Sequence, residues 1–141
     1  MGKKIVITTV LFLLFFCSCQ TGPRIWDSSY PEEKLTEIRF LNFDIDSYNG
    51  ISVTRFYWVK IPAGDITFAG TAYMSHSGVR FFADGMEFSS HFEGGKSYIV
   101  YGGHNDMRWG VKIYEGTDYS QVKDENMLVF VPFKEQPVFI K

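Results

Sequence analysis

Closely spaced turn signals constrain this chain more than any other feature of its sequence. Clusters of glycine, proline and asparagine recur about every 8–12 residues after residue 45, a spacing typical of all-β domains. The segments between them alternate in polarity, as in 86–92, where Met86 and Phe88 share one face. No segment keeps the 3.6-residue apolar period of a helix. The pattern therefore predicts an antiparallel β sandwich or barrel.

The turn clusters divide the chain into expected strands. Asn49-Gly50 is the strongest short signal for a hairpin. Gly70 suggests a bulge within its strand, and Pro132 and Pro137 restrict the last segments to a sheet edge. We place turns or loops at 46–50, 62–65, 74–78, 83–85, 93–96, 102–107 and 116–126. The expected strands are 35–45, 51–61, 66–73, 79–82, 86–92, 97–101, 109–114, 127–133 and 138–140.

Composition supports a sheet with a core of its own. Aromatic residues make up 18% of the chain, and aromatic side chains suit the half-buried surface of a pleated sheet. With 141 residues, the chain is long enough for one self-supporting domain. The expected core comprises Leu41, Phe43, Val53, Val59, Ile61, Phe68, Phe88, Phe92, Tyr98, Val100, Val111 and Ile113.

The N-terminal segment has the composition of an export signal. Lys3 and Lys4 give it a positive start, and the apolar run 5–16 follows at once. That run is shorter than the roughly 20 residues that a membrane-spanning helix needs. We therefore expect 1–18 to be a signal peptide, which makes the mature chain more acidic by removing both lysines.

The end of this leader resembles the lipobox of bacterial lipoproteins. Ser18 stands before Cys19 as the small residue does in that motif, and Phe16 fits the relaxed lipoboxes of spirochaete-type proteins. The resemblance implies that Cys19 becomes the acylated first residue, since two or three acyl chains hold a protein stably at a membrane. Cys17 is the alternative acylation site. The segment 1–18 is alternatively an ordinary secretory signal peptide that is cleaved without acylation, or an uncleaved membrane anchor.

Three segments follow from this interpretation. They are a lipoprotein signal peptide at 1–18, an acylated cysteine and tether at 19–34, and a single β-sandwich domain at 35–141.

Charge and cysteine content exclude several classes of protein. The formal net charge is −2, and no basic cluster follows the leader, which argues against a nucleic-acid partner. Both cysteines, Cys17 and Cys19, lie at the end of the leader, so the domain must be stabilised without a disulfide. No motif for a nucleotide is present, and we expect no cofactor.

The histidines give no metal or catalytic motif. His76, His91 and His104 do not have zinc-ligand spacing, and a zinc site needs three or four convergent ligands. His76 and His104 fall in loops that can share one end of a sandwich. Ser89 lies about 6–7 Å from His91 along one strand face, too far for a catalytic pair. We therefore expect no metal and no enzyme, and keep a hydrolase only as a third hypothesis.

Exposed aromatic residues are the best candidates for a binding surface. Phe56 and Trp58 oppose the expected core face of their strand, and Tyr114 opposes it on another. Contiguous exposed aromatic side chains mark a ligand or partner surface. The competing interpretation is that a second sheet or the segment 127–140 covers these faces.

The order of turns and strands over 35–115 resembles a known kind of envelope module. The hairpin at 48–51, the sequence VKIPAG at 59–64 and FEGGKSY at 92–98 are similar to PEGA-like, transthyretin-like modules and to small uncharacterised spirochaete-type lipoproteins. The resemblance implies a single antiparallel β-sandwich, immunoglobulin-like or PEGA-like, of roughly seven to nine strands. It implies no enzymatic role and identifies no functional residue, and 116–141 lies outside it without an assigned role.

These observations lead to two functional hypotheses. The first is a non-catalytic, lipid-anchored cell-envelope protein that binds a protein partner or serves in assembly. The alternative is a carbohydrate- or glycan-binding sandwich that uses Phe56, Trp58 and Tyr114. We expect the protein at the periplasmic face or the cell surface. The outer membrane is favoured because Gln20 follows Cys19 in place of the aspartate that retains some lipoproteins at the inner membrane.

Overall fold

The computed structural model describes residues 30–141, apart from the side chains at 54 and 55, and shows an all-β protein. The predicted signal peptide 1–18 and Cys19 lie outside these residues, as does most of the predicted tether. Within 30–141, no helix is long and apolar enough to span a membrane. The elements are η1 (Glu32–Lys34), β1 (Leu35–Leu41), β2 (Phe43–Tyr48), β3 (Ile51–Phe56), β4 (Trp58–Pro62), β5 (Gly64–His76), β6 (Val79–Phe92), β7 (Ser97–Asn105), β8 (Arg108–Glu115), η2 (Tyr119–Gln121), η3 (Asp124–Asn126) and β9 (Val129–Pro132).

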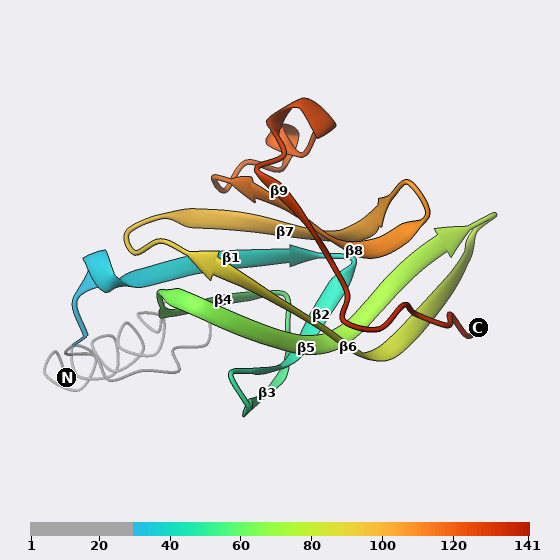
Figure 1. Ribbon diagram of the computed structural model, residues 1–141, viewed down its shortest axis with the longest axis horizontal. Coiled ribbons are helices and arrows are strands. Elements are labelled where there is room, and N and C mark those ends of the chain that lie inside the picture. Colours follow the sequence, from blue (N-terminus) through green and yellow to red (C-terminus); the bar gives the residue numbers. More distant parts are fainter. Residues whose placement is uncertain (1–29) are drawn as a thin grey trace, which may run out of the picture.

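The strands form two sheets that pack as a sandwich (Figure 1). Sheet A has the order β4-β1-β7-β8-β9, and sheet B has the order β3-β2-β5-β6. Neighbouring strands are antiparallel except for β1 and β7, which are parallel. The predicted sandwich is confirmed, whereas a wholly antiparallel arrangement is wrong for this one pair. No hairpin joins β1 to β7, so nothing imposes an antiparallel direction on them.

The first change of sheet occurs at Asn42, where the expected strand 35–45 breaks in two. Asn42 has a left-handed φ of 53°, and β1 before it belongs to sheet A while β2 after it belongs to sheet B. The break shifts the phase of the alternation, so that Phe40 and Phe43 both enter the core. Leu41 lies half-buried on the other face of β1, and its predicted place in the core is wrong.

The second change of sheet occurs at Tyr57, which splits the expected strand 51–61 into β3 and β4. The Tyr57 carbonyl accepts a 2.6 Å hydrogen bond from the backbone N–H of Phe40. This bond fixes the bend against β1. β3 therefore extends the edge of sheet B and β4 extends the edge of sheet A.

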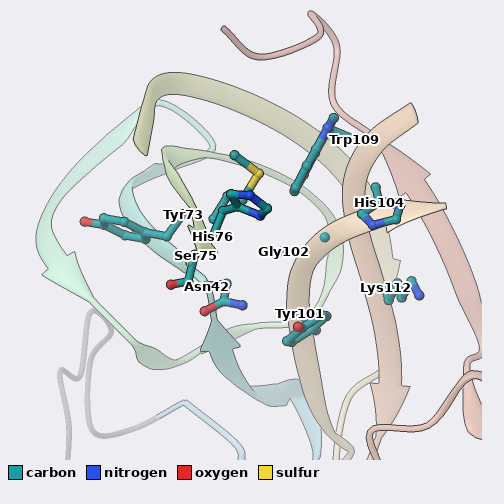
Figure 2. Close-up of a pocket in the computed structure, with 11 residues that line it drawn as sticks. Asn42, Tyr73, Ser75, His76, Tyr101, Gly102, His104, Trp109 and Lys112 are labelled. Atoms are coloured by element: carbon teal, nitrogen blue, oxygen red, sulfur yellow. The ribbon is translucent and has the colours of Figure 1, made fainter. Parts of the chain in front are cut away.

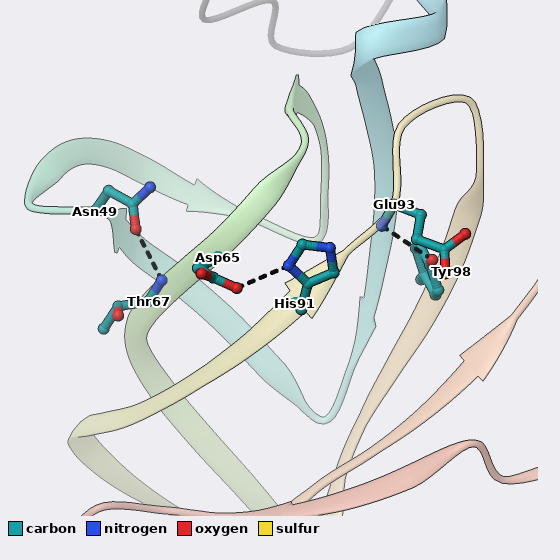
Figure 3. Close-up of polar contacts among 6 residues, drawn as sticks. All are labelled: Asn49, Asp65, Thr67, His91, Glu93 and Tyr98. Carbon is teal, nitrogen blue, oxygen red and sulfur yellow. Dashed lines mark hydrogen bonds and ion pairs between the residues drawn. The ribbon is translucent and has the colours of Figure 1, made fainter.

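Local turn chemistry predicts the β2–β3 hairpin correctly. Asn49 and Gly50 have φ values of 46° and 77°, the left-handed pair that a type I′ turn requires. The Asn49 side chain also accepts a 2.8 Å hydrogen bond from the backbone N–H of Thr67 (Figure 3). The turn is therefore tied to the neighbouring strand β5.

The predicted turn at 83–85 is wrong, because β6 runs through it as one long strand. Residues 84 and 85 form a bulge, with Gly85 at a φ of 71° and a register shift opposite Gly70 and Ala72. Across this bulge the buried Thr71 hydroxyl donates a 2.7 Å hydrogen bond to the carboxylate of Asp84. A left-handed glycine here marks a bulge rather than a chain reversal.

The bulge expected within the strand of Gly70 is wrong, because the extra residues lie on the neighbouring strands, at 84–85 on β6 and at Asp46 on β2. Gly70 instead permits close approach of β2, since a Cβ there would clash with the Asp44 carbonyl oxygen.

Aromatic rings fill the space between the sheets. Phe43 contacts Phe88 edge to face at 5.5 Å between ring centroids and stacks on Phe133 at 5.7 Å. Phe68 contacts Phe40 at 5.1 Å and Phe92 at 6.0 Å. These rings come from both sheets and are all buried. Except for Leu41 and the half-buried Val53, the predicted core residues are buried.

The C-terminal segment crosses from sheet A to the edge of sheet B (Figure 1). After β9, the backbone N–H of Phe133 bonds to the Trp109 carbonyl and that of Lys134 bonds to the Glu87 carbonyl. Ile140 then pairs with Phe82 on β6 through two 2.9 Å backbone hydrogen bonds. The segment 133–140 therefore acts as a strap across one side of the sandwich.

The two ends of the sandwich differ. β1 begins at one end of the sandwich, directly after Lys34. We call this end the entry end. The β5–β6 and β7–β8 hairpins turn at the opposite end, together with the β1–β2 corner at Asn42 (Figure 1). We call this opposite end the far end.

We expect Gly102→Ala to lower the free energy of unfolding by about 1–3 kcal/mol, the usual cost of overpacking. A Cβ at Gly102 would lie 2.6 Å from the backbone carbonyl oxygen of Asn42, which cannot move without shifting the corner. Urea denaturation measures the difference. Asn105→Ala, at an exposed position of the same strand, should change the value by less than about 0.5 kcal/mol. Equal stability of the two variants would contradict this account of the corner.

Candidate functional site

A cavity of about 540 Å³ opens at the far end of the sandwich (Figure 2). Sheet B contributes Met74 and His76 from the end of β5, and sheet A contributes His104 and Trp109 from the β7–β8 hairpin. The cavity lies where β5, β7 and β8 extend beyond the phenylalanine side chains of the core. Its size falls within the usual range of ligand pockets, about 300–1,000 Å³.

Backbone geometry at the corner shapes this cavity. Asn42 lines it from its left-handed turn, and the Asn42 carbonyl accepts a 2.9 Å hydrogen bond from the N–H of Tyr73. Gly102 also lines the cavity, and its lack of a side chain lets β7 approach the corner closely. The two sheets are therefore held at a fixed position relative to each other where the cavity opens.

Contacts from the C-terminal segment hold Trp109 in the cavity. Its ring contacts Phe139 edge to face at 4.7 Å between centroids and His104 at 5.3 Å. The side-chain amide of Gln136 accepts from the backbone N–H of Trp109 at 2.7 Å and donates to the Trp109 backbone carbonyl at 3.1 Å. The C-terminal strap thus positions this ring on one wall of the cavity.

The chemistry of the lining suits recognition of a polar partner. Imidazoles, hydroxyls, an amide and a lysine are combined with aromatic rings, and no carboxylate is among the residues that line the cavity. His76 and His104 do lie at one end of the sandwich, but at the ends of β5 and β7 and not in the predicted loops, because both strands extend further than expected. Across the described part of the chain, no group of three or more His, Cys, Asp or Glu residues is arranged to hold a metal ion.

The remaining histidine and its neighbouring serine have separate partners on β5. His91 Nδ1 lies 2.7 Å from the Asp65 carboxylate (Figure 3), and the Ser89 hydroxyl lies 2.7 Å from that of Thr67. Asp65 and His91 are both solvent-exposed, so this contact contributes little to stability. Ser89 and His91 therefore do not form a nucleophile and base.

The structure does not bring the three predicted aromatic residues together. Phe56 is half-buried and packs against the core. Tyr114 is only 1% exposed, so its predicted exposure is wrong. Trp58 is half-buried and lines a different concavity, described below.

Tyr114 is buried on the outer face of sheet A, away from the phenylalanine core. Its neighbours on that face are Ile99, opposite it on β7, and the segment that carries η2 and η3. Lys112 attaches this segment through a 2.8 Å ion pair with Asp124. Burial raises the pKa of the Tyr114 phenol, and the hydrogen bond to Asp124 raises the pKa of Lys112.

Trp58 lines a groove of about 340 Å³ on the outer face of sheet A, together with Glu37, Arg39, Tyr57 and Tyr119. We call this the Trp58 groove. Arg39 lies opposite Trp58 in the β1–β4 register and donates two hydrogen bonds, of 3.1 and 3.0 Å, to Oε1 of Glu37. Burial of Arg39 opposes its charged form, but its hydrogen bonds and charge interactions with Glu37 and Tyr119 together outweigh this effect and raise its pKa.

The sequence pattern does not show where the core ends or where the chain bends, so it does not identify most of the residues in these two sites. The alternation in β8 assigns Trp109 to the core face, but it does not show that the core ends there. Alternation along the expected strand 51–61 assigns Tyr57 to the core face, which is wrong because the chain bends there and leaves Tyr57 64% exposed. Tyr119 comes from a loop, where no strand alternation applies. The left-handed preference of Asn at position 42 was the available signal for the corner.

We expect Tyr114→Ala to lower the free energy of unfolding by about 3–5 kcal/mol, as for other buried aromatic residues. Tyr57→Ala, which truncates a side chain that is 64% exposed, should cost less than about 0.5 kcal/mol. Chemical denaturation compares the two. If Tyr114→Ala were as stable as Tyr57→Ala, the burial of Tyr114 would be refuted.

Comparison with known proteins gives no match: no family model, no curated protein and no solved structure is significantly similar to this chain.

Proposed function

We propose that this chain is a lipid-anchored, non-catalytic module of the bacterial cell envelope that binds a protein partner. The export signal at 1–18 and the lipobox-like sequence before Cys19 support the anchor and the location. The similarity of the turns and strands over 35–115 to PEGA-like envelope modules supports the same location.

The position of the cavity is the observation that carries this proposal. β1 receives the tether at the entry end, and the cavity opens at the far end of the sandwich (Figures 1 and 2). A protein anchored at Cys19 would therefore hold its cavity away from the membrane. Such an orientation suits the capture of a partner that is not itself in the lipid layer.

The rim of the far end favours a protein as that partner. Met107, at the β7–β8 turn, is 96% exposed, and Val138 is 83% exposed beside Phe139, which packs on Trp109. Covering such exposed apolar side chains with a partner removes them from water, which makes the free energy of binding more favourable. Methionine is also enriched in protein interfaces.

We expect Cys19→Ser to abolish incorporation of labelled palmitate, because the thiol of Cys19 is the atom that would be acylated. Cys17→Ser is the matched control and should retain the label. Metabolic labelling followed by immunoprecipitation, with the signal divided by protein abundance, measures both. Label that persists in Cys19→Ser and disappears in Cys17→Ser would move the anchor to the other cysteine.

We expect a photo-crosslinking amino acid in place of Met107 to form a protein adduct in intact cells. The same group in place of Glu93, in the β6–β7 turn at the entry end, is the control and should form none. Val138→Asp should reduce the Met107 adduct roughly tenfold, since it places a charge on the apolar rim. Adducts of equal yield from Met107 and Glu93 would speak against a partner at the far end.

A further inference from the structure

We propose that the Trp58 groove binds a neutral sugar ring of a glycan. This site lies on the outer face of sheet A, whereas the cavity of the proposed protein partner lies at the far end of the sandwich. The proposal does not depend on the protein-binding function. Its grounds are the aromatic walls, the polar floor and the rigidity of the groove.

Three aromatic rings from separate segments converge on the groove. Trp58 begins β4, Tyr57 is 64% exposed at the bend before it, and Tyr119 is 45% exposed on η2. Aromatic rings carry a negative face, which attracts the positively polarised C–H bonds on the flat side of a sugar ring. Rings at this degree of exposure can stack on a sugar without first leaving a core.

The groove also offers donors and acceptors side by side. Arg39 has five N–H groups; two of them bond to Glu37, and the guanidinium also hydrogen-bonds with the side chain of Tyr119, which leaves further donors of the planar fork. The carboxylate of Glu37 supplies acceptors next to them. A sugar hydroxyl both donates and accepts, so adjacent hydroxyls match an Arg–Glu pair. The two charges balance each other, which favours a neutral sugar over an acidic one.

Several contacts hold the walls in place before a ligand arrives. Asp118 accepts a 2.9 Å hydrogen bond from the N–H of Ser120 at the start of η2, which lowers the pKa of its carboxyl. The ion pair between Lys112 and Asp124 attaches the same segment to sheet A. A groove that is already ordered loses little conformational entropy on binding.

The test uses the mature acylated protein in a zwitterionic detergent, because detergents with sugar headgroups would compete. The probes are the neutral tetrasaccharides of N-acetylglucosamine, of β-1,4-glucose and of mannose, with tetragalacturonate as the acidic contrast. Calorimetry gives the dissociation constant, and the variants below assign the binding to the groove. We expect at least one neutral tetrasaccharide to bind and tetragalacturonate to bind more weakly.

Matched variants assign the binding to the groove. Tyr119→Ala removes one wall from an exposed turn and should raise the dissociation constant about tenfold. Arg39→Lys keeps the charge but loses the planar donor fork, and we expect a similar increase. His104→Ala alters the far-end cavity and should leave sugar binding unchanged. Thermal unfolding checks that all three variants are folded.

Four results would overturn the proposal. They are no binding of any neutral tetrasaccharide, tighter binding of tetragalacturonate, binding that survives both groove variants, and loss of sugar binding in His104→Ala, which would place the sugar in the far-end cavity. The Met107 crosslink is measured separately, so failure of the protein-partner proposal can be told apart from failure of this one.

Discussion

The packing of phenylalanine rings between the two sheets is the interaction on which the rest of this structure depends. Both cysteines lie before residue 20, so no disulfide joins the sheets within the described domain; instead Phe40 of sheet A contacts Phe43 and Phe68 of sheet B. Beyond these rings, His76 and His104 continue the two facing strands and line the cavity.

Local chemistry in the sequence accounts for much of the fold. The Asn49-Gly50 hairpin and most of the core follow from turn preferences and alternation, because these depend on neighbouring residues only. The breaks at Asn42 and Tyr57 do not, because apolar side chains continue on both sides of each break. Leu41 was misplaced for this reason, since a corner shifts the phase of the alternation without interrupting it.

The candidate sites were harder to predict than the fold, and Tyr114 shows why. Alternation correctly places it on the face of β8 opposite the core, but that face is covered by a segment with no strand pattern of its own. The same segment supplies Tyr119 to the groove beside Trp58, so one loop removes a predicted site residue and provides another. Such effects depend on where a loop packs, which neither composition nor periodicity specifies.

The strap between Phe133 and Ile140 has a consequence for how the molecule is made. Strand β6 forms one edge of sheet B, and Ile140 pairs with its outer backbone groups at Phe82. Along the sequence, β7, β8 and β9 of sheet A all lie between these two residues. A polypeptide delivered with its N-terminus first leaves this edge open until residue 140 emerges. If the chain crosses a membrane unfolded and the strap pairs with β6 only after crossing, the edge of β6 is exposed to other chains for a shorter time.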